Sequence, residues 1–171
     1  ALPGEEMEFS EPRPYTHPDL LPFPDRSLTA RYRGRYFSEW MRPMASIRTS
    51  VGCTNRCSFC ALWTITGGRY LRRDPERVVE ELRTIEEPNV FFCDDESMRD
   101  VRRMDRLADR IREAGIRKRY FLYARVDTIV RNPALFAKWR SIGLTQVFVG
   151  MESFSDERLR AMGKGITTDQ Q

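Results

Sequence analysis

Residues 52–63, GCTNRCSFCALW, hold three of the chain's four cysteines: Cys53, Cys57 and Cys60. Residues 45–51, ASIRTSV, lead directly into this stretch and are predicted to form a short buried β-strand. The three thiols therefore lie on the loop that follows a strand. In parallel α/β folds such loops carry the functional groups, so this one stretch connects the fold to a site.

From residue 45 onward, short apolar runs alternate with amphipathic stretches. Strands are predicted at residues 45–51, 90–93, 120–126 and 145–150. Helices are predicted to open at Asp74-Pro75, to cover residues 101–114, to open at Asn132-Pro133, and to follow Ser155. Strands that alternate with helices in this way are parallel and joined by crossovers. The pattern predicts an α/β fold with about four βα units, either an open doubly wound sheet or part of a β/α barrel.

Residues 1–44 differ in character from the rest of the chain. They hold most of the prolines and show little apolar periodicity, which predicts an extended arm or linker. We therefore expect two parts, the arm at residues 1–44 and a core domain at residues 45–171. The first residue is Ala1 and not methionine, so we also expect this chain to be part of a longer protein.

The charge of the chain argues for a solvated surface. The net charge is +4, but the arginines of residues 99–119 alternate with acidic residues, as on a solvent-facing helix. This disfavours nucleic acid as a partner. No apolar run is long enough to cross a membrane, and the N-terminal residues lack the pattern of a signal peptide. We expect a cytoplasmic protein without a membrane partner.

Polar residues cluster where the predicted strands end. The cysteine loop follows the first strand; the other clusters are Asp94, Asp95 and Glu96 after the second, Arg125 and Asp127 at the end of the third, and Glu152 and Ser153 after the fourth. Because parallel strands end at one edge of their sheet, these groups are expected to form a single site.

The cysteine spacing CxxxCxxC indicates a metal centre with an open position. Structural zinc sites use four ligands, usually as two CxxC-type pairs, and no second pair is present here. Three thiolates can bind three irons of a four-iron cluster and leave the fourth iron open. A structural zinc and an unliganded thiol cluster remain the alternatives. Cys93 is interpreted either as a small buried residue or as a fourth ligand.

CTNRCSFC, with an aromatic residue before its third cysteine, resembles the signature of radical S-adenosylmethionine (radical SAM) enzymes. The resemblance extends from about Ile47 to the end of the chain. It implies that Cys53, Cys57 and Cys60 bind a 4Fe-4S cluster and that S-adenosylmethionine chelates the open iron. It further implies reductive cleavage to a 5′-deoxyadenosyl radical, hydrogen abstraction from an unknown substrate, and an electron donor such as flavodoxin or ferredoxin.

The same resemblance implies roles for the polar residues at the strand ends. Phe59 would lie near the adenine, and Asp95 or Glu96 would contact the methionyl amino group. Arg125 would pair with the methionyl carboxylate, a geometry suited to a guanidinium group. Glu152 and Ser153 would contact the ribose hydroxyls. The alternatives are that Phe59 is a core residue and that Asp94 and Asp95 only cap the next segment of the chain.

A narrower resemblance joins DLLPFPDR in the arm, TSVGC at the loop, FFCDDE after the second strand and GMES with LRAMGKGIT near the end. These stretches are similar to radical SAM enzymes that carry an N-terminal cobalamin-binding domain. They imply use of cobalamin, bound mainly by a domain not in this sequence, for methylation or rearrangement. The alternative function is a non-catalytic iron–sulfur module for electron transfer, or a zinc-binding module.

Overall fold

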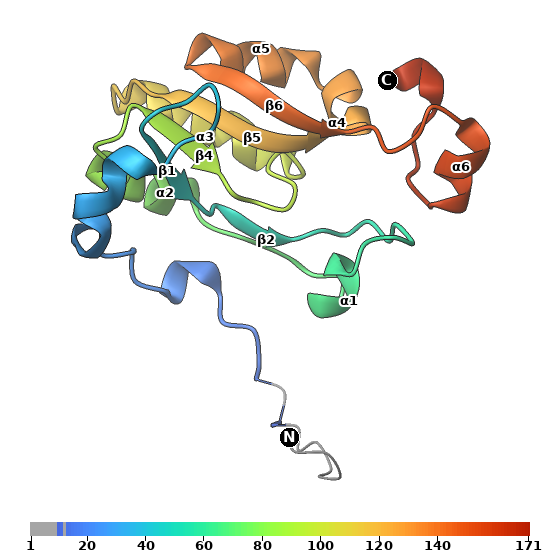
Figure 1. Cartoon of the computed structure of the whole chain (residues 1–171), viewed down its shortest axis with the longest axis horizontal. Coiled ribbons are helices and arrows are strands. Elements are labelled where there is room, and N and C mark those ends of the chain that lie inside the picture. Colours follow the sequence, from blue (N-terminus) through green and yellow to red (C-terminus); the bar gives the residue numbers. More distant parts are fainter. Residues whose placement is uncertain (1–9, 12) are drawn as a thin grey trace.

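The protein is described from a computed structural model, which covers residues 10, 11 and 13–171. Residues 1–9 and 12 of the predicted arm lie outside the described residues. Within the described part, four parallel strands form one sheet in the order β1-β4-β5-β6. They are β1 (Met44–Ile47), β4 (Asn89–Phe92), β5 (Arg119–Arg125) and β6 (Leu144–Gly150). Spatial order follows chain order, so each crossover joins neighbouring strands (Figure 1).

The register brings the strands to a common edge. Met44 pairs with Asn89, and Asn89 pairs in turn with Arg119, so β1, β4 and β5 are in step along their length. Strand β6 continues beside β5 as far as the pairing of Arg125 with Gly150. The segments that leave the carboxyl ends of these strands therefore emerge at the same end of the sheet.

Three longer helices follow the strands: α2 (Pro75–Thr84), α3 (Val101–Glu113) and α5 (Pro133–Ser141). Shorter ones are α1 (Leu62–Ile65), α4 (Val126–Arg131) and α6 (Asp156–Ala161). The predicted starts at Asp74-Pro75 and Ser155 are confirmed. Asp74 accepts a hydrogen bond from the Glu76 amide at 2.8 Å, and Ser155 accepts one from the Arg158 amide at 3.4 Å.

The main core lies between the sheet and the longer helices. Alternate strand residues, including Val90, Phe92, Tyr120 and Leu122, are fully buried against residues of α2, α3 and α5. The ring of Trp139 meets those of Phe92 and Tyr120 edge-on at 5.6 and 5.8 Å. This packing fixes the strands and hence the loops that leave their ends.

The predicted strand at residues 45–51 is wrong in one respect, since the chain bends within it. Strand β1 ends at Ile47, and Ser50–Gly52 forms a separate strand, β2, which pairs antiparallel with β3 (Tyr70–Arg72). The Asp94 carboxylate accepts hydrogen bonds from the amides of Thr49 and Ser50, at 2.6 and 2.8 Å, and so fixes the bend. The β2–β3 hairpin was not predicted.

The third predicted strand also ends one residue earlier than expected. Residues 120–126 were predicted as strand, whereas β5 ends at Arg125 and Val126 is the first residue of α4. Figure 1 shows α1 and α6 on the same side of the molecule, beyond the carboxyl ends of β5 and β6.

The described part of the predicted arm contains two 3₁₀ helices, η1 (Pro18–Leu20) and η2 (Arg26–Arg35). Arg26 ties η2 to the edge strand, because its Nη2 atom donates to the Ser46 carbonyl at 3.0 Å. Among the described residues, no helix is long and apolar enough to cross a membrane.

Candidate functional site

The cysteine loop connects β2 to α1. It begins at Gly52, whose φ of 93° lies in the left-handed region and where a Cβ atom would lie 2.1 Å from the Arg69 carbonyl oxygen. Glycine is therefore required at this position. The thiols of Cys53, Cys57 and Cys60 are free, with Cys57 buried and the other two half-buried.

The far side of the loop rests on the turn after α6. The Ser58 amide donates to the Met162 carbonyl at 2.9 Å, and Trp63 donates from its ring nitrogen to the Cys57 carbonyl at 3.2 Å. The start of the loop is held by Asp95, which accepts a hydrogen bond from the Gly52 amide at 2.7 Å. Segments from three parts of the chain thus fix the loop.

Arg125, at the end of β5, lies beside the loop. Its Nη1 atom is 3.7 Å from the Cys57 sulfur, its Nε atom donates to Asp127 at 2.9 Å, and its Nη2 atom donates to the Lys164 carbonyl. Burial alone would lower the pKa of Arg125, but the charges of Asp127 and Cys57 raise it overall. The site therefore holds a buried, permanently charged guanidinium next to one predicted cluster ligand.

Lys164 joins three of the predicted residues and was missed as a site residue by the sequence reasoning. Its Nζ atom lies 2.8 Å from Glu152 Oε1 and 5.7 Å from the centre of the Phe59 ring, and its carbonyl accepts from Arg125. Lys164 is the lysine of the GKGIT stretch noted in the sequence, but only the folded chain brings this lysine next to the cysteine loop. Phe59 is 53% exposed, so its interpretation as a core residue is wrong.

Glu152 has an unusual backbone conformation. Its φ is 71°, and it is the only residue other than glycine with a positive φ in the described part of the chain. Such strain persists where the surroundings enforce it, and it is concentrated at functional sites. Ser153 lies next to it, with its hydroxyl accepting from the Ser155 amide at 3.2 Å and its carbonyl accepting from Gln171.

Glu96 is buried and incompletely paired. It is 2% exposed, and its Oε1 atom has no hydrogen-bond partner among the described residues. Burial raises the pKa of Glu96 to about 7, although the positive charge of Arg125 opposes the shift. A buried carboxylate with a free oxygen is suited to accept a donor from a bound molecule.

Asp94 and Asp95 do not cap the next segment of the chain, so that interpretation is wrong. They bind the amides of Thr49, Ser50 and Gly52, which precede the cysteines. The helix that comes after them, α3, is capped by Asp100, which accepts from the Arg103 amide at 3.0 Å.

Cys93 lies on the side of the sheet that faces the arm, where it lines a cavity together with arm residues. Its thiol donates to the Ile47 carbonyl at 3.3 Å, and burial raises its pKa. The cavity has a volume of about 520 Å³. These contacts suit a small structural residue.

The donors present are those that an iron–sulfur cluster requires. Three free thiols lie on one loop beside a buried cation. Within residues 10, 11 and 13–171, no three His, Cys, Asp or Glu side chains converge as ligands of a metal ion. The thiolates that hold a four-iron cluster bind different irons, so they lie farther apart than the ligands of a single ion. We conclude that the donor set fits the cluster.

A parallel βα sheet that carries a three-cysteine loop at its carboxyl edge defines a class of cluster-binding proteins. The family model described as the radical SAM superfamily matches residues 47–171. The chain therefore belongs to the radical SAM superfamily. Its fold is consistent with part of a β/α barrel of that type, as predicted.

Three relatives and one solved structure show how broad the similarity is. The hopanoid C-3 methylase of Methylococcus capsulatus (strain Bath) is 37% identical over 147 residues, covering 84% of this chain. An uncharacterized methyltransferase of Pyrococcus horikoshii is 29% identical over 164 residues, covering 93% of the chain. The anaerobic magnesium-protoporphyrin IX monomethyl ester cyclase of Rubrivivax gelatinosus is 27% identical over 123 residues, covering 70%.

The solved structure is that of OxsB, described as a cobalamin-dependent S-adenosylmethionine radical enzyme, with aqua-cobalamin and S-adenosylmethionine bound. It superposes with a TM-score of 0.64 at 20% identity, over 73% of this chain and 20% of OxsB. The chain spans 28% of the hopanoid methylase, 35% of the Pyrococcus methyltransferase and 22% of the cyclase.

Proposed function

We propose that this chain forms the cofactor-binding part of a radical SAM enzyme and that its site cleaves S-adenosylmethionine reductively. The observation that carries the proposal is the placement of the CxxxCxxC loop against Arg125, at the edge where Glu96 and Glu152 also lie. An electron carrier with four ligands needs no such set of strand-end groups.

Each predicted site residue has a role in this proposal. Cys53, Cys57 and Cys60 would hold the 4Fe-4S cluster. Glu96, with its free oxygen, would accept the methionyl amino group, while Asp95 holds the base of the loop. When bound, the cluster would supply the single electron needed for reductive cleavage of the sulfonium C–S bond, which would yield methionine and a 5′-deoxyadenosyl radical able to remove a hydrogen atom from substrate.

The remaining residues would orient the nucleoside and the carboxylate. Phe59, exposed beside Lys164, would lie near the adenine. Glu152 and Ser153 would contact the ribose hydroxyls, with the Glu152 carboxylate held in place by Lys164. Arg125 would attract the methionyl carboxylate from its place beside Cys57.

We further propose that the complete enzyme uses cobalamin for methylation or rearrangement. Support comes from the arm and loop stretches that resemble this subgroup, and from relatives described as methylases or as cobalamin-dependent. An electron donor of the flavodoxin or ferredoxin kind, a cytoplasmic location and the division at residue 44 stay predictions, and the substrate is unknown.

The test is reconstitution with iron and sulfide in the absence of oxygen, followed by electron paramagnetic resonance of the reduced protein. We expect a reduced 4Fe-4S signal that changes when S-adenosylmethionine is added. Cys53→Ala, Cys57→Ala and Cys60→Ala should each abolish the signal.

Cys93→Ala is the matched control. It should leave both the signal and its response to S-adenosylmethionine unchanged, because the Cys93 thiol donates a hydrogen bond to the Ile47 carbonyl. A cluster that ignores S-adenosylmethionine and is lost in the Cys93→Ala variant would replace this proposal with an electron-transfer module. Zinc bound in place of iron would refute the proposal that this chain acts as a radical SAM enzyme.

A further inference from the structure

A buried carboxylate connects the arm to the core domain. Glu81, on α2, is 2% exposed and is bound by two arginines. Arg26 of the arm reaches its Oε1 atom at 2.7 Å, and Arg73, just after β3, reaches its Oε2 atom at 2.6 Å. A buried charge that loses one of its partners is strongly destabilised, so the two arginines depend on each other through Glu81.

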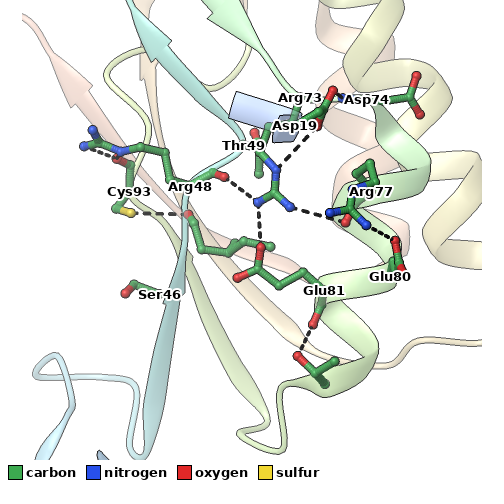
Figure 2. A network of polar contacts seen from close by, with 12 residues as sticks. Asp19, Ser46, Arg48, Thr49, Arg73, Asp74, Arg77, Glu80, Glu81 and Cys93 are labelled. Atoms are coloured by element: carbon green, nitrogen blue, oxygen red, sulfur yellow. Dashed lines mark hydrogen bonds and ion pairs between the residues drawn. The ribbon is translucent and has the colours of Figure 1, made fainter. Parts of the chain in front are cut away.

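Arg73 also holds the bend that precedes the cysteine loop. Its Nη1 atom donates to the Arg48 carbonyl at 2.9 Å, and its amide donates to the Thr49 carbonyl at 2.9 Å. Figure 2 shows the Arg73 guanidinium between Glu81 on one side and the Arg48–Thr49 backbone on the other. Any displacement of this side chain therefore moves the bend.

A second arginine completes the attachment of the bend. Arg103 of α3 donates from Nη2 to the Thr49 carbonyl at 2.9 Å and from Nε to the Arg73 carbonyl at 2.7 Å. On the opposite side, Asp94 accepts the amides of Thr49 and Ser50. All of these groups are buried.

The distance along the chain from this bend to the first cysteine is short. Strand β2 covers Ser50–Gly52, and Cys53 follows immediately. Gly52 has no side chain of its own and is held through its amide by Asp95. The position of the Cys53 backbone is therefore set by the bend and by the two aspartates.

The arm contacts Arg73 in two further places. Asp19 lies 3.8 Å from Arg73 Nε through one oxygen, and through the other it accepts the Asp74 amide at 2.9 Å. The ring of Phe23 lies beneath two guanidinium groups, 5.5 Å from that of Arg73 and 4.3 Å from that of Arg77. Asp19 and Phe23 of the arm thus contact Arg73 directly, and Arg26 is connected to it through Glu81.

We propose that the arm acts as a clamp on the cysteine loop, with Arg26 and Asp19 as positioning residues that act through Glu81 and Arg73. With the arm in place, Arg73 is fixed and the bend at Arg48-Thr49 presents Cys53 in one position. With the arm displaced, Arg73 loses these partners and the bend loosens. The functional meaning of the clamp rests on the proposed role of the loop as the cluster site.

The arm itself offers a matched control. Arg33, also in η2, pairs with Glu86 and with Glu87, which follow the carboxyl-terminal end of α2, the latter at 3.2 Å. Neither of these ion pairs involves Arg73 or the bend. Arg33→Met therefore weakens the attachment of the arm but leaves the Arg26–Glu81–Arg73 connection intact. Arg26→Met removes that connection.

The experiment measures amide hydrogen exchange by mass spectrometry on the metal-free, full-length chain. Arg26→Met should accelerate exchange in peptides that span residues 48–53 by about fivefold or more, with β5 as internal reference. Arg26→Lys should restore most of the protection, because it keeps the charge near Glu81. Arg33→Met should leave this segment within about twofold of the parent protein.

Equal acceleration by Arg26→Met and Arg33→Met, or none by Arg26→Met, would overturn the proposal. Should Arg26→Met fail to fold, Asp19→Asn serves in its place. That change keeps an acceptor for the Asp74 amide and removes the charge beside Arg73. The readout requires no cluster, so failure of the clamp and failure of the proposed enzyme chemistry are separate results.

Discussion

The Nη1 atom of Arg125 lies 3.7 Å from the sulfur of Cys57, although the two residues are 68 positions apart in the chain. The same guanidinium donates to Asp127 at 2.9 Å, and all three residues are buried. A positive charge that cannot be lost therefore lies between the Asp127 carboxylate and the Cys57 thiol. Two consequences can be measured in variants of Arg125: the free energy of unfolding of the metal-free chain, and the amount of iron bound on reconstitution.

Arg125→Met should destabilise the metal-free chain by about 3 kcal/mol, because it leaves Asp127 buried without its main partner. Chemical denaturation measures this change. Arg131→Met is the control, since Arg131 is exposed and lies 3.7 Å from the other oxygen of Asp127; we expect less than about 0.5 kcal/mol. Equal losses in both variants would contradict the prediction. On reconstitution, Arg125→Met should also bind less iron per chain.

Glu96 should make stability depend on pH. Its pKa rises from an ordinary 4.5 to about 7 in the folded chain, so between these values the folded state keeps a proton that the unfolded state has released. The free energy of unfolding should therefore fall as the pH rises through this window and level off above it. Over the whole window the loss amounts to about 3 kcal/mol.

Glu96→Gln cannot ionise and should remove this part of the pH dependence. Near pH 4 the variant should resemble the parent protein, and near pH 8 it should be more stable by up to about 3 kcal/mol. Denaturation curves at several pH values give the difference directly, and the subtraction cancels the titration of Asp94, whose pKa is also raised by burial. A difference that does not vary with pH would show that the pKa of Glu96 does not change on folding.

The positive φ of Glu152 predicts which substitution at this position gives the more stable protein. Both Glu152→Gly and Glu152→Ala remove the ion pair with Lys164, but alanine retains the strain of φ 71° and glycine does not. The glycine variant should be the more stable of the two by about 1 kcal/mol in urea denaturation. Both should bind S-adenosylmethionine more weakly than the parent protein. An alanine variant as stable as the glycine variant would mean that the backbone relaxes on substitution.

Asp94 should contribute more to stability than an ordinary helix cap. Asp94→Ala leaves the amides of Thr49 and Ser50 buried without acceptors, and we expect a loss of about 3 kcal/mol. Asp100→Ala removes the cap of α3 and should cost about 1 kcal/mol. Thermal or chemical unfolding of the two variants compares them, and the reverse order would refute the assignment of Asp94 to the bend.

The strands and helices could be predicted largely from sequence, because their signals are local. Apolar runs such as residues 90–93 and caps such as Asp74 act within a few positions of where they stand. The bend at Arg48-Thr49 could not be predicted, because the groups that fix it come from Asp94, Arg73 and Arg103. No glycine or proline at residues 45–51 marks the bend.

The position of the cysteine loop in the fold could be predicted from sequence, and the contacts that surround it could be predicted less well. The spacing of the cysteines is encoded locally, whereas Lys164 reaches Glu152 and Phe59 only after the last helix has folded back. The interpretation of Asp94 and Asp95 as caps of the next segment was wrong for a related reason. A cap acts on residues close by in the chain, whereas these carboxylates bind amides more than forty positions earlier, in the bend and in β2.

The hydrogen bond between Ser58 and Met162 sets an order of events during synthesis. The cysteine loop leaves the ribosome early, but its resting surface is the turn after α6, which is made much later. Contacts between distant segments form late in folding. A nascent chain that stops short of this turn lacks the acceptor for the Ser58 amide, so the cysteine loop reaches its final position only after translation has passed α6.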